Sequence, residues 1–263
     1  MPGVRHFHES VAGCDVSVRR GGSGPPLLFL HGARGAADWL PFMEKLSRSF
    51  DVIVPEHPGF GQSETPAWLD NIHDLAYFYL DFMEHLGIEQ IHLMGASMGG
   101  WIAAELAVRD QHRLRSLTLV APAGIHVQGV QTGDFFLWSE QELVHNLFAS
   151  QRFAEEMALL NEKRTQEEKD IQLKNKLTAA KLAWQPRLHD PHLKKWLHRI
   201  TVPALIVWGA EDKLIPAEHG PEFRDLIPNS RLEIFPDCGH LPQVEKMADF
   251  VGLVGRFVQG IQP

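Results

Sequence analysis

Short apolar runs recur along the chain, and stretches with a helical pattern lie between them. Most runs end at a glycine or a proline; residues 204–208, for example, are followed by Gly209. Continuous apolar runs of this length are typical of strands that are buried on both faces of a parallel sheet. The alternation predicts an α/β domain with a mostly parallel central sheet and right-handed crossovers. The expected strands are at residues 26–30, 52–54, 91–94, 117–120, 204–208 and 231–235.

The segment from His126 to Ile200 departs from this alternation. It contains no convincing strand, two stretches rich in helix formers at 155–160 and 167–182, and scattered aromatic residues. It carries 11 basic and 10 acidic residues, whereas the rest of the chain carries 14 and 23. We predict that residues 126–200 form a helical cap over a core of residues 1–125 and 201–263. The aromatic residues of this segment either pack against the core or roof an apolar pocket.

The sequence Gly95-Ala96-Ser97-Met98-Gly99 lies between an expected strand and a helical pattern at 101–109. A sharp strand-to-helix turn of this kind places a serine at a helix N-terminus, where backbone N–H groups face developing negative charge. Small residues are needed on both sides because chain segments approach closely there. This context predicts that Ser97 is a nucleophile and that the Met98 N–H is one oxyanion donor. A structural glycine-rich turn with an ordinary serine is the alternative.

A nucleophilic serine needs a base, and the base needs a carboxylate to orient it. His240 follows the last expected strand and Asp212 follows the one before it, so both are expected at the carboxyl edge of the sheet. The order serine, acid, histidine is typical of such a site. Glu211 and Asp237 are weaker candidates for the acid. His31 is a weaker candidate for the base, since it precedes the serine and has no neighbouring acid.

The loop after the first expected strand begins with His31 and Gly32. This loop is where a second oxyanion donor is expected, and we predict that the backbone N–H of Ala33 supplies it. His31 would then tie loops together. The candidate substrate-binding residues are Arg34, Trp184, Arg187 and Leu241.

Composition excludes several classes of function. The formal net charge is −8, so the chain offers no basic surface for nucleic acid or anionic membrane. Its two cysteines, Cys14 and Cys238, are far apart, and the sequence shows no clustered metal ligands. The first residues contain no signal-peptide pattern, and no apolar stretch is long enough to span a bilayer. We expect a cytoplasmic protein that needs no metal or cofactor; its oligomeric state stays open.

Several spaced stretches resemble the motifs of the α/β-hydrolase superfamily, over essentially the whole chain. The chain is most similar to the capped carboxylesterases and to the meta-cleavage C–C hydrolases, which cleave vinylogous diketones from aromatic catabolism. The resemblance implies the α/β-hydrolase fold with a helical cap, and hydrolysis without a cofactor. The stretches are His31-Gly32, 56–63, 95–100, 209–212 and Gly239-His240, with 185–187, 207–209 and 237–240 resembling the C–C hydrolases in particular.

Three places differ from the C–C hydrolases that the chain resembles. Those enzymes typically carry Asn before the serine, Trp after the histidine and a Ser-Gly-Pro-rich oxyanion loop. Here the same places hold Ala96, Leu241 and the stretch 33–35. We therefore predict a serine hydrolase that cleaves a small or medium hydrophobic carboxylic ester. Two alternatives stay open: a C–C hydrolase of meta-cleavage products, and a non-catalytic member of the fold that binds a ligand.

Overall fold

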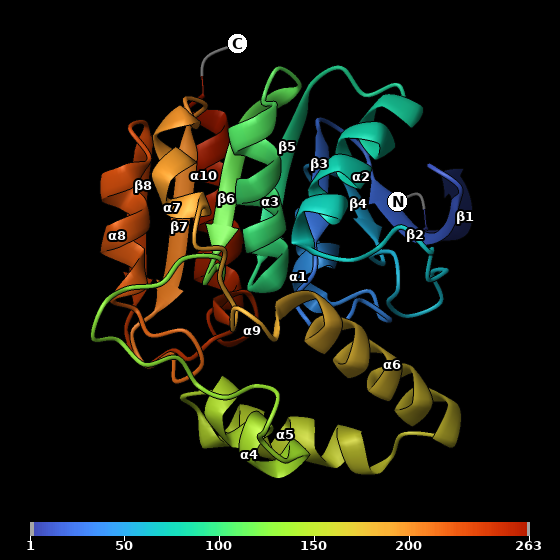
Figure 1. The fold of residues 1–263 in the computed structure, drawn as a ribbon, viewed down its shortest axis with the longest axis vertical. Coiled ribbons are helices and arrows are strands. Elements are labelled where there is room, and N and C mark those ends of the chain that lie inside the picture. Colours follow the sequence, from blue (N-terminus) through green and yellow to red (C-terminus); the bar gives the residue numbers. More distant parts are fainter. Residues whose placement is uncertain (1–2, 262–263) are drawn as a thin grey trace.

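The computed structural model describes residues 3–261 and is built on a single eight-stranded sheet (Figure 1). The strand order is β1-β2-β4-β3-β5-β6-β7-β8. The pairings of β1 with β2 and of β2 with β4 are antiparallel, and the remaining pairings are parallel. The strands are β1 (Arg5–Val11), β2 (Cys14–Gly22), β3 (Pro26–Leu30), β4 (Asp51–Pro55), β5 (Ile91–Ala96), β6 (Leu114–Val120), β7 (Ala204–Gly209) and β8 (Ser230–Phe235).

The predicted fold class is confirmed, and the six expected strands correspond to β3 through β8. All residues of β5 and β7 are buried, as expected of strands covered on both faces. The same expectation is wrong for β8, which lies at the edge of the sheet and is largely exposed or half-buried. The hairpin of β1 and β2 was not expected, because its charged and histidine residues hide the apolar pattern of strands.

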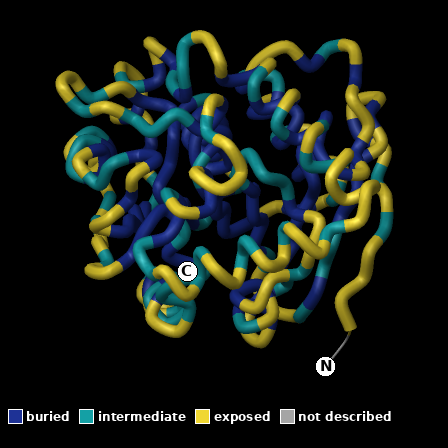
Figure 2. Tube along the Cα trace, turned by 90° about the horizontal axis from the view of Figure 1, so that it is seen from below, coloured by how far each residue is buried: buried dark blue, intermediate teal, exposed yellow. Residues whose placement is uncertain are grey.

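Helices cover both faces of the sheet. Alternate side chains of a strand point to opposite faces, so Leu28 and Leu30 of β3 join one buried cluster and Leu27 and Phe29 the other. The first cluster contains α2, α3 and α8, and the second contains α1 and α10. In Figure 2 the buried parts of the chain lie in the middle and the exposed parts at the periphery. These helices are α1 (Pro41–Leu46), α2 (Ile72–His85), α3 (Met98–Arg109), α8 (His219–Leu226) and α10 (Met247–Gln259), and the short α9 (Pro242–Glu245) precedes α10.

The segment 126–200, which we call the insert, is helical between β6 and β7. It holds α4 (Glu140–Leu147), α5 (Gln151–Glu162), α6 (Gln166–Ala183), α7 (Leu193–Trp196) and the short η1 (Leu197–Arg199), and none of its residues belongs to the sheet. In Figure 1, α4, α5 and α6 lie beyond the carboxyl ends of β6 and β7. That the insert forms a cap over the core stays a prediction.

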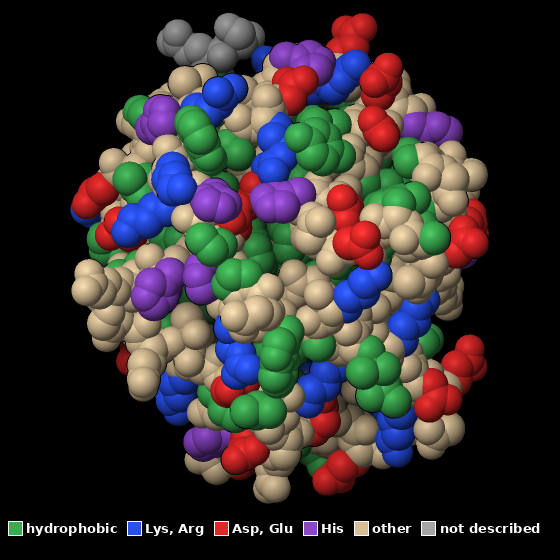
Figure 3. Space-filling model, viewed as in Figure 1, with side chains coloured by type: hydrophobic (Ala, Val, Ile, Leu, Met, Phe, Trp, Pro, Cys, Tyr) green, Lys and Arg blue, Asp and Glu red, His purple; other side chains and the backbone are tan. Residues whose placement is uncertain are grey.

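The surface of the molecule is mixed in character. In Figure 3, acidic and basic side chains are interspersed with hydrophobic ones over the face seen in Figure 1. Within residues 3–261, no helix combines the length and the apolar character needed to cross a membrane. Seven large hydrophobic residues of the insert helices and the loops beside them are exposed: Leu137, Leu159, Leu160, Leu173, Leu177, Trp184 and Trp196.

Candidate active site

Ser97 occupies the turn between β5 and α3. Its backbone has φ 54° and ψ −118°, a conformation that costs free energy for a residue with a side chain. The turn is tight: a Cβ added at Gly95 would overlap the Gly99 carbonyl oxygen, and one added at Gly99 would overlap the Leu30 carbonyl oxygen. The glycines on both sides of the serine are therefore required by close packing. They leave Ser97 half-buried at the N-terminus of α3, at the carboxyl edge of the sheet.

Asp212 and His240 form a buried pair at the same edge of the sheet. The Nδ1 of His240 lies 2.7 Å from Oδ2 of Asp212, and both side chains are almost wholly excluded from solvent. The other carboxylate oxygen accepts the backbone N–H groups of Leu214 and Ile215, each at 2.9 Å. Because a carboxylate only accepts, His240 donates from Nδ1 and carries a lone pair on Nε2. That Nε2 atom is buried and has no hydrogen-bond partner among residues 3–261.

The rival residues are placed differently. Glu211 and Asp237 are exposed, and neither forms a hydrogen bond or ion pair through its side chain with another described residue. His31 is buried, and its Nε2 accepts the backbone N–H of His57 at 2.9 Å while its Nδ1 lies 2.7 Å from the Gly32 carbonyl oxygen. Burial lowers the pKa of His31 to about 4. With both ring nitrogens occupied, His31 holds two loops together and is not free to take a proton from the serine.

Neither of the two proposed oxyanion donors is paired with a backbone oxygen of residues 3–261. Met98 is the first residue of α3, so its N–H lacks an acceptor within the helix. The Ala33 N–H donates to no backbone oxygen of the described chain. The loop that carries Ala33 lies against the serine, since a Cβ added at Gly32 would be 3.2 Å from the Ser97 Cβ. Their role as oxyanion donors stays a prediction.

Comparison with known proteins gives the family. The family model described as alpha/beta hydrolase fold matches residues 25–247. The chain belongs to this family. It is 30% identical to a 2-hydroxymuconate semialdehyde hydrolase of Pseudomonas sp. (strain CF600), over 94% of this chain and 91% of that protein. It is 31% identical to the dihydrolipoyllysine-residue acetyltransferase component of the acetoin cleaving system of Cupriavidus necator, over 92% of this chain but only 66% of that protein.

A solved structure agrees with this assignment. The crystal structure of a membrane phospholipase A, described as a bacterial virulence factor, superimposes with a TM-score of 0.82 at 26% identity. The match covers 98% of this chain and 87% of that one. The predicted resemblance to the α/β hydrolases is therefore confirmed, including its meta-cleavage branch, whose hydrolases are among the relatives.

Two candidate substrate-binding residues of this α/β hydrolase lie beside the proposed machinery. Arg34 follows Ala33 in the loop after β3, and its Nη1 lies 3.2 Å from a carboxylate oxygen of Glu140 in α4. Arg34 and Ala33 also line one small surface cavity together with residues of α4 and α6. Leu241 directly follows His240, is half-buried and packs against the hydrophobic core. Their part in substrate binding stays a prediction.

The other two candidates contact each other in the insert. The Arg187 guanidinium pairs with Asp134 and lies 4.3 Å from the ring centroid of Trp184. Trp184 is 42% exposed, and its ring centroid lies 5.4 Å from that of the buried Phe136. Arg187 thus already has a carboxylate partner within the protein, Asp134.

Sequence reasoning missed Glu245, the last residue of α9. Its carboxylate accepts the backbone N–H of Gly239 at 2.6 Å, beside His240, and that of Ser150 in the insert at 2.8 Å. In addition, the backbone N–H of His240 donates to the Leu147 carbonyl oxygen at 2.8 Å. The loop that carries His240 is thus held by the insert, although no local pattern in the sequence marks Glu245.

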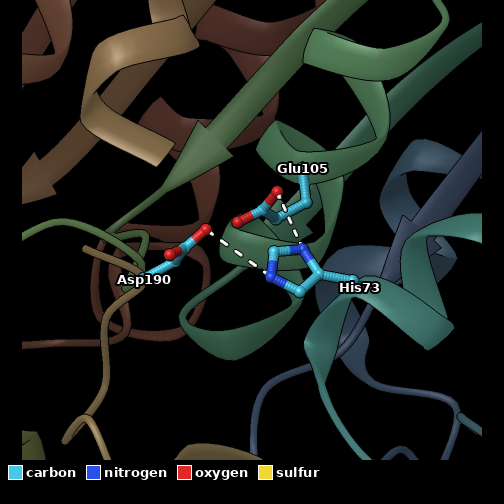
Figure 4. Close-up of side chains that lie close together, drawn as sticks. All are labelled: His73, Glu105 and Asp190. Carbon is cyan, nitrogen blue, oxygen red and sulfur yellow. Dashed lines mark ion pairs between the residues drawn. The ribbon is translucent and has the colours of Figure 1, made fainter. Parts of the chain in front are cut away.

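A cluster of ionisable side chains lies outside this site and resembles a set of metal ligands (Figure 4). His73, Glu105 and Asp190 offer ligand atoms that all lie within 4.8 Å of one another. His73 lies 3.4 Å from Glu105 and 3.6 Å from Asp190. The Arg109 guanidinium donates to Glu105 and already supplies a positive charge there. The cluster is therefore best described as an ion-pair network that joins α2, α3 and the end of the insert.

The network predicts a pH-dependent contribution to stability. The neighbouring Glu105 carboxylate raises the pKa of His73 above its ordinary value of 6.5, and Asp190 adds to this whereas burial and Arg109 oppose it. A histidine whose pKa is raised by folding stabilises the fold fully when the pH is below its pKa in the unfolded chain. This stabilisation is lost as the pH rises through its pKa in the folded protein. His73→Gln should therefore weaken the fall in Tm above about pH 6.5, measured by thermal unfolding across pH. His198→Gln, which removes an exposed histidine without an ion pair among residues 3–261, is the control; equal pH slopes for both variants would contradict the prediction.

Proposed function

We propose that this α/β hydrolase cleaves small or medium hydrophobic carboxylic esters through an acyl-enzyme on Ser97. One observation carries the proposal. A buried Asp212–His240 pair lies at the same sheet edge as a serine held in a strained turn, and the histidine Nε2 has no partner in the part of the chain that the structure describes. Such a pair is needed to remove the proton of a serine hydroxyl, whose own pKa is far above neutrality.

The reaction that we propose has two halves. Ser97 Oγ attacks the ester carbonyl carbon while His240 Nε2 takes its proton, and the Ala33 and Met98 N–H groups stabilise the oxyanion. The C–O bond to the alcohol then breaks, and His240 returns the proton to the leaving alkoxide. Water attacks the acyl-enzyme with His240 as base, which releases the acid and restores Ser97. Asp212 stabilises the imidazolium in both halves and holds the ring in the required tautomer.

We also propose that the insert serves as the cap of this site. Leu147 and Glu245 connect it to the loop of His240, and the Arg34–Glu140 ion pair connects it to the loop of Ala33. Helices in this position limit the space above the serine and contribute apolar side chains to substrate binding.

A neutral ester suits the charges around the proposed site. Arg34 and Arg187 each pair with a carboxylate of the protein, Glu140 and Asp134. An anionic substrate would have to compete with these partners.

The alternative, C–C cleavage, is favoured by relatives named 2-hydroxymuconate semialdehyde hydrolase and 2-hydroxy-6-oxo-2,4-heptadienoate hydrolase, at 30% and 28% identity. The alternative is also favoured by Arg34 Nη2, which is buried without a partner in the described chain. This nitrogen could donate to the carboxylate of a dienoate such as the one in the second relative's name.

The test uses one preparation of the protein on p-nitrophenyl esters of graded acyl length, on lactones and on ring-fission diketones. We expect turnover of the shorter esters that exceeds turnover of the diketones. Fluorophosphonate labelling followed by peptide mapping should place the probe on Ser97. Faster diketone cleavage would favour the C–C alternative. An unlabelled Ser97 together with no turnover of any substrate would favour a ligand-binding protein.

A further inference from the structure

The direction of the Ala33 N–H, on which the proposed oxyanion hole depends, is set by its peptide partner. A peptide unit is planar, so this N–H points opposite to the Gly32 carbonyl of the same unit. The Gly32 oxygen is held by two donors: Nδ1 of His31 at 2.7 Å and the Gly35 N–H at 3.1 Å. Fixing that oxygen fixes the Ala33 N–H. The Gly35 N–H therefore has to be held in place itself.

Asn175 of α6 holds the peptide unit that contains the Gly35 N–H. Its Nδ2 donates to the Arg34 carbonyl oxygen at 2.9 Å, and its Oδ1 accepts the Gly61 N–H at 2.8 Å. The residue is 2% exposed, although it lies on a helix that is otherwise largely exposed or half-buried. Gly35 has φ +88°, and a Cβ there would collide with the Asn175 amide. The loop and the amide are thus fitted closely to each other.

We propose that Asn175 is a positioning residue for the oxyanion hole, an inference that rests on the proposed function. Asn175 donates to the carbonyl oxygen of the Arg34–Gly35 peptide unit, and the N–H of that unit donates to the Gly32 carbonyl oxygen. The Gly32 carbonyl belongs to the same peptide unit as the Ala33 N–H. The amide supplies both a donor group, Nδ2, and an acceptor, Oδ1, and both are used, so no other side chain of this length replaces it. A helix of the insert thereby sets the orientation of a backbone donor in the core.

The seating of α6 does not depend on Asn175 alone. Thr178 Oγ1 donates to the Gly59 carbonyl oxygen at 2.8 Å. Lys174 Nζ donates to the carbonyl oxygens of Gly61 and Ser63 at 3.0 and 2.7 Å. These contacts join the same helix to the core but do not reach the loop of Ala33. Thr178→Val is therefore a matched control that removes one buried hydrogen bond of α6 and keeps the shape of the side chain.

The test compares Asn175→Asp, Asn175→Ala and Thr178→Val with the unaltered protein on its best ester. Aspartate keeps the bond from Gly61 but places a carboxylate oxygen against the Arg34 carbonyl, which repels it. We expect kcat to fall about 10²-fold in both Asn175 variants with KM changed less than about threefold, since the oxyanion forms only in the transition state. Thr178→Val should lower Tm comparably and keep kcat within about twofold.

Two outcomes would overturn the inference: equal kcat values for the Asn175 variants and Thr178→Val, or a loss carried wholly by KM. Tm shows whether each variant is folded. If Asn175→Asp fails to fold, Asn175→Ala decides, because it introduces no repulsion. Failure of the proposed function is separate: Ser97→Ala would then retain the ester turnover, whatever the Asn175 variants do.

Discussion

Ser97→Ala is expected to lower kcat by about 10⁶-fold, to the level left by substrate binding and the oxyanion donors alone. The substitution removes the attacking oxygen and nothing else of consequence. The Ser97 side chain makes no capping bond to α3, and alanine experiences the same strain at φ 54°. Tm should therefore change little, and fluorophosphonate labelling should be lost. Stopped assays with purified protein on the best ester, together with thermal unfolding, measure both effects.

Ser150→Ala is the matched control for this substitution. Ser150 also stands at the N-cap of a helix, α5, and its side chain makes no capping bond there either. It should retain activity and labelling. Undiminished turnover in Ser97→Ala would show that another group performs the chemistry, and the proposed acyl-enzyme would have to be abandoned.

Asp212→Asn is expected to lower kcat by about 10⁴-fold while leaving the fold intact. The asparagine oxygen still accepts the N–H groups of Leu214 and Ile215, as the Asp212 Oδ1 does. Its NH₂ group then faces His240 Nδ1, where the carboxylate accepted a proton at 2.7 Å. The histidine has to adopt the other tautomer, with its proton on Nε2. That nitrogen can no longer accept the serine proton.

Glu211→Gln is the control, since it makes the same change of group one residue earlier on an exposed side chain. It should keep kcat within about twofold, as most surface substitutions do. Measuring kcat against pH adds a second readout, because the Asp212→Asn enzyme should regain rate in alkaline solution, where hydroxide replaces the base. Equal activity of the two variants would remove Asp212 from the proposed triad.

The fold could be predicted largely because its central strands are buried on both sides. Continuous apolar runs such as those of β5 and β7 follow directly from that burial. The hairpin of β1 and β2 lies at the edge, where water satisfies polar side chains and the pattern is lost. The strand β8 lies at the other edge, where polar and apolar residues alternate and every residue is exposed or half-buried.

The residues of the candidate site fall into two groups: some are marked by the sequence around them, and others are placed by contacts with distant parts of the chain. Ser97 could be predicted from the small residues that its turn requires, and Asp212 and His240 from their places after strands. Glu245 and Asn175 could not, because their roles arise from contacts with residues far away in sequence. The Asn175 amide and the Arg34 carbonyl, for example, are 141 positions apart. A polar residue on an amphipathic helix looks the same whether it faces water or a buried loop.

The hydrogen bonds between the insert and the His240 loop bear on how this enzyme could be re-engineered. Leu147 and Ser150 from the insert meet Gly239, His240 and Glu245 from the core. A chimera that exchanges residues 126–200 for those of a homologue would change the proposed cap and the contacts of the His240 loop at once. Directed evolution of specificity should therefore randomise the exposed positions of α5 and α6 and keep these anchor points constant.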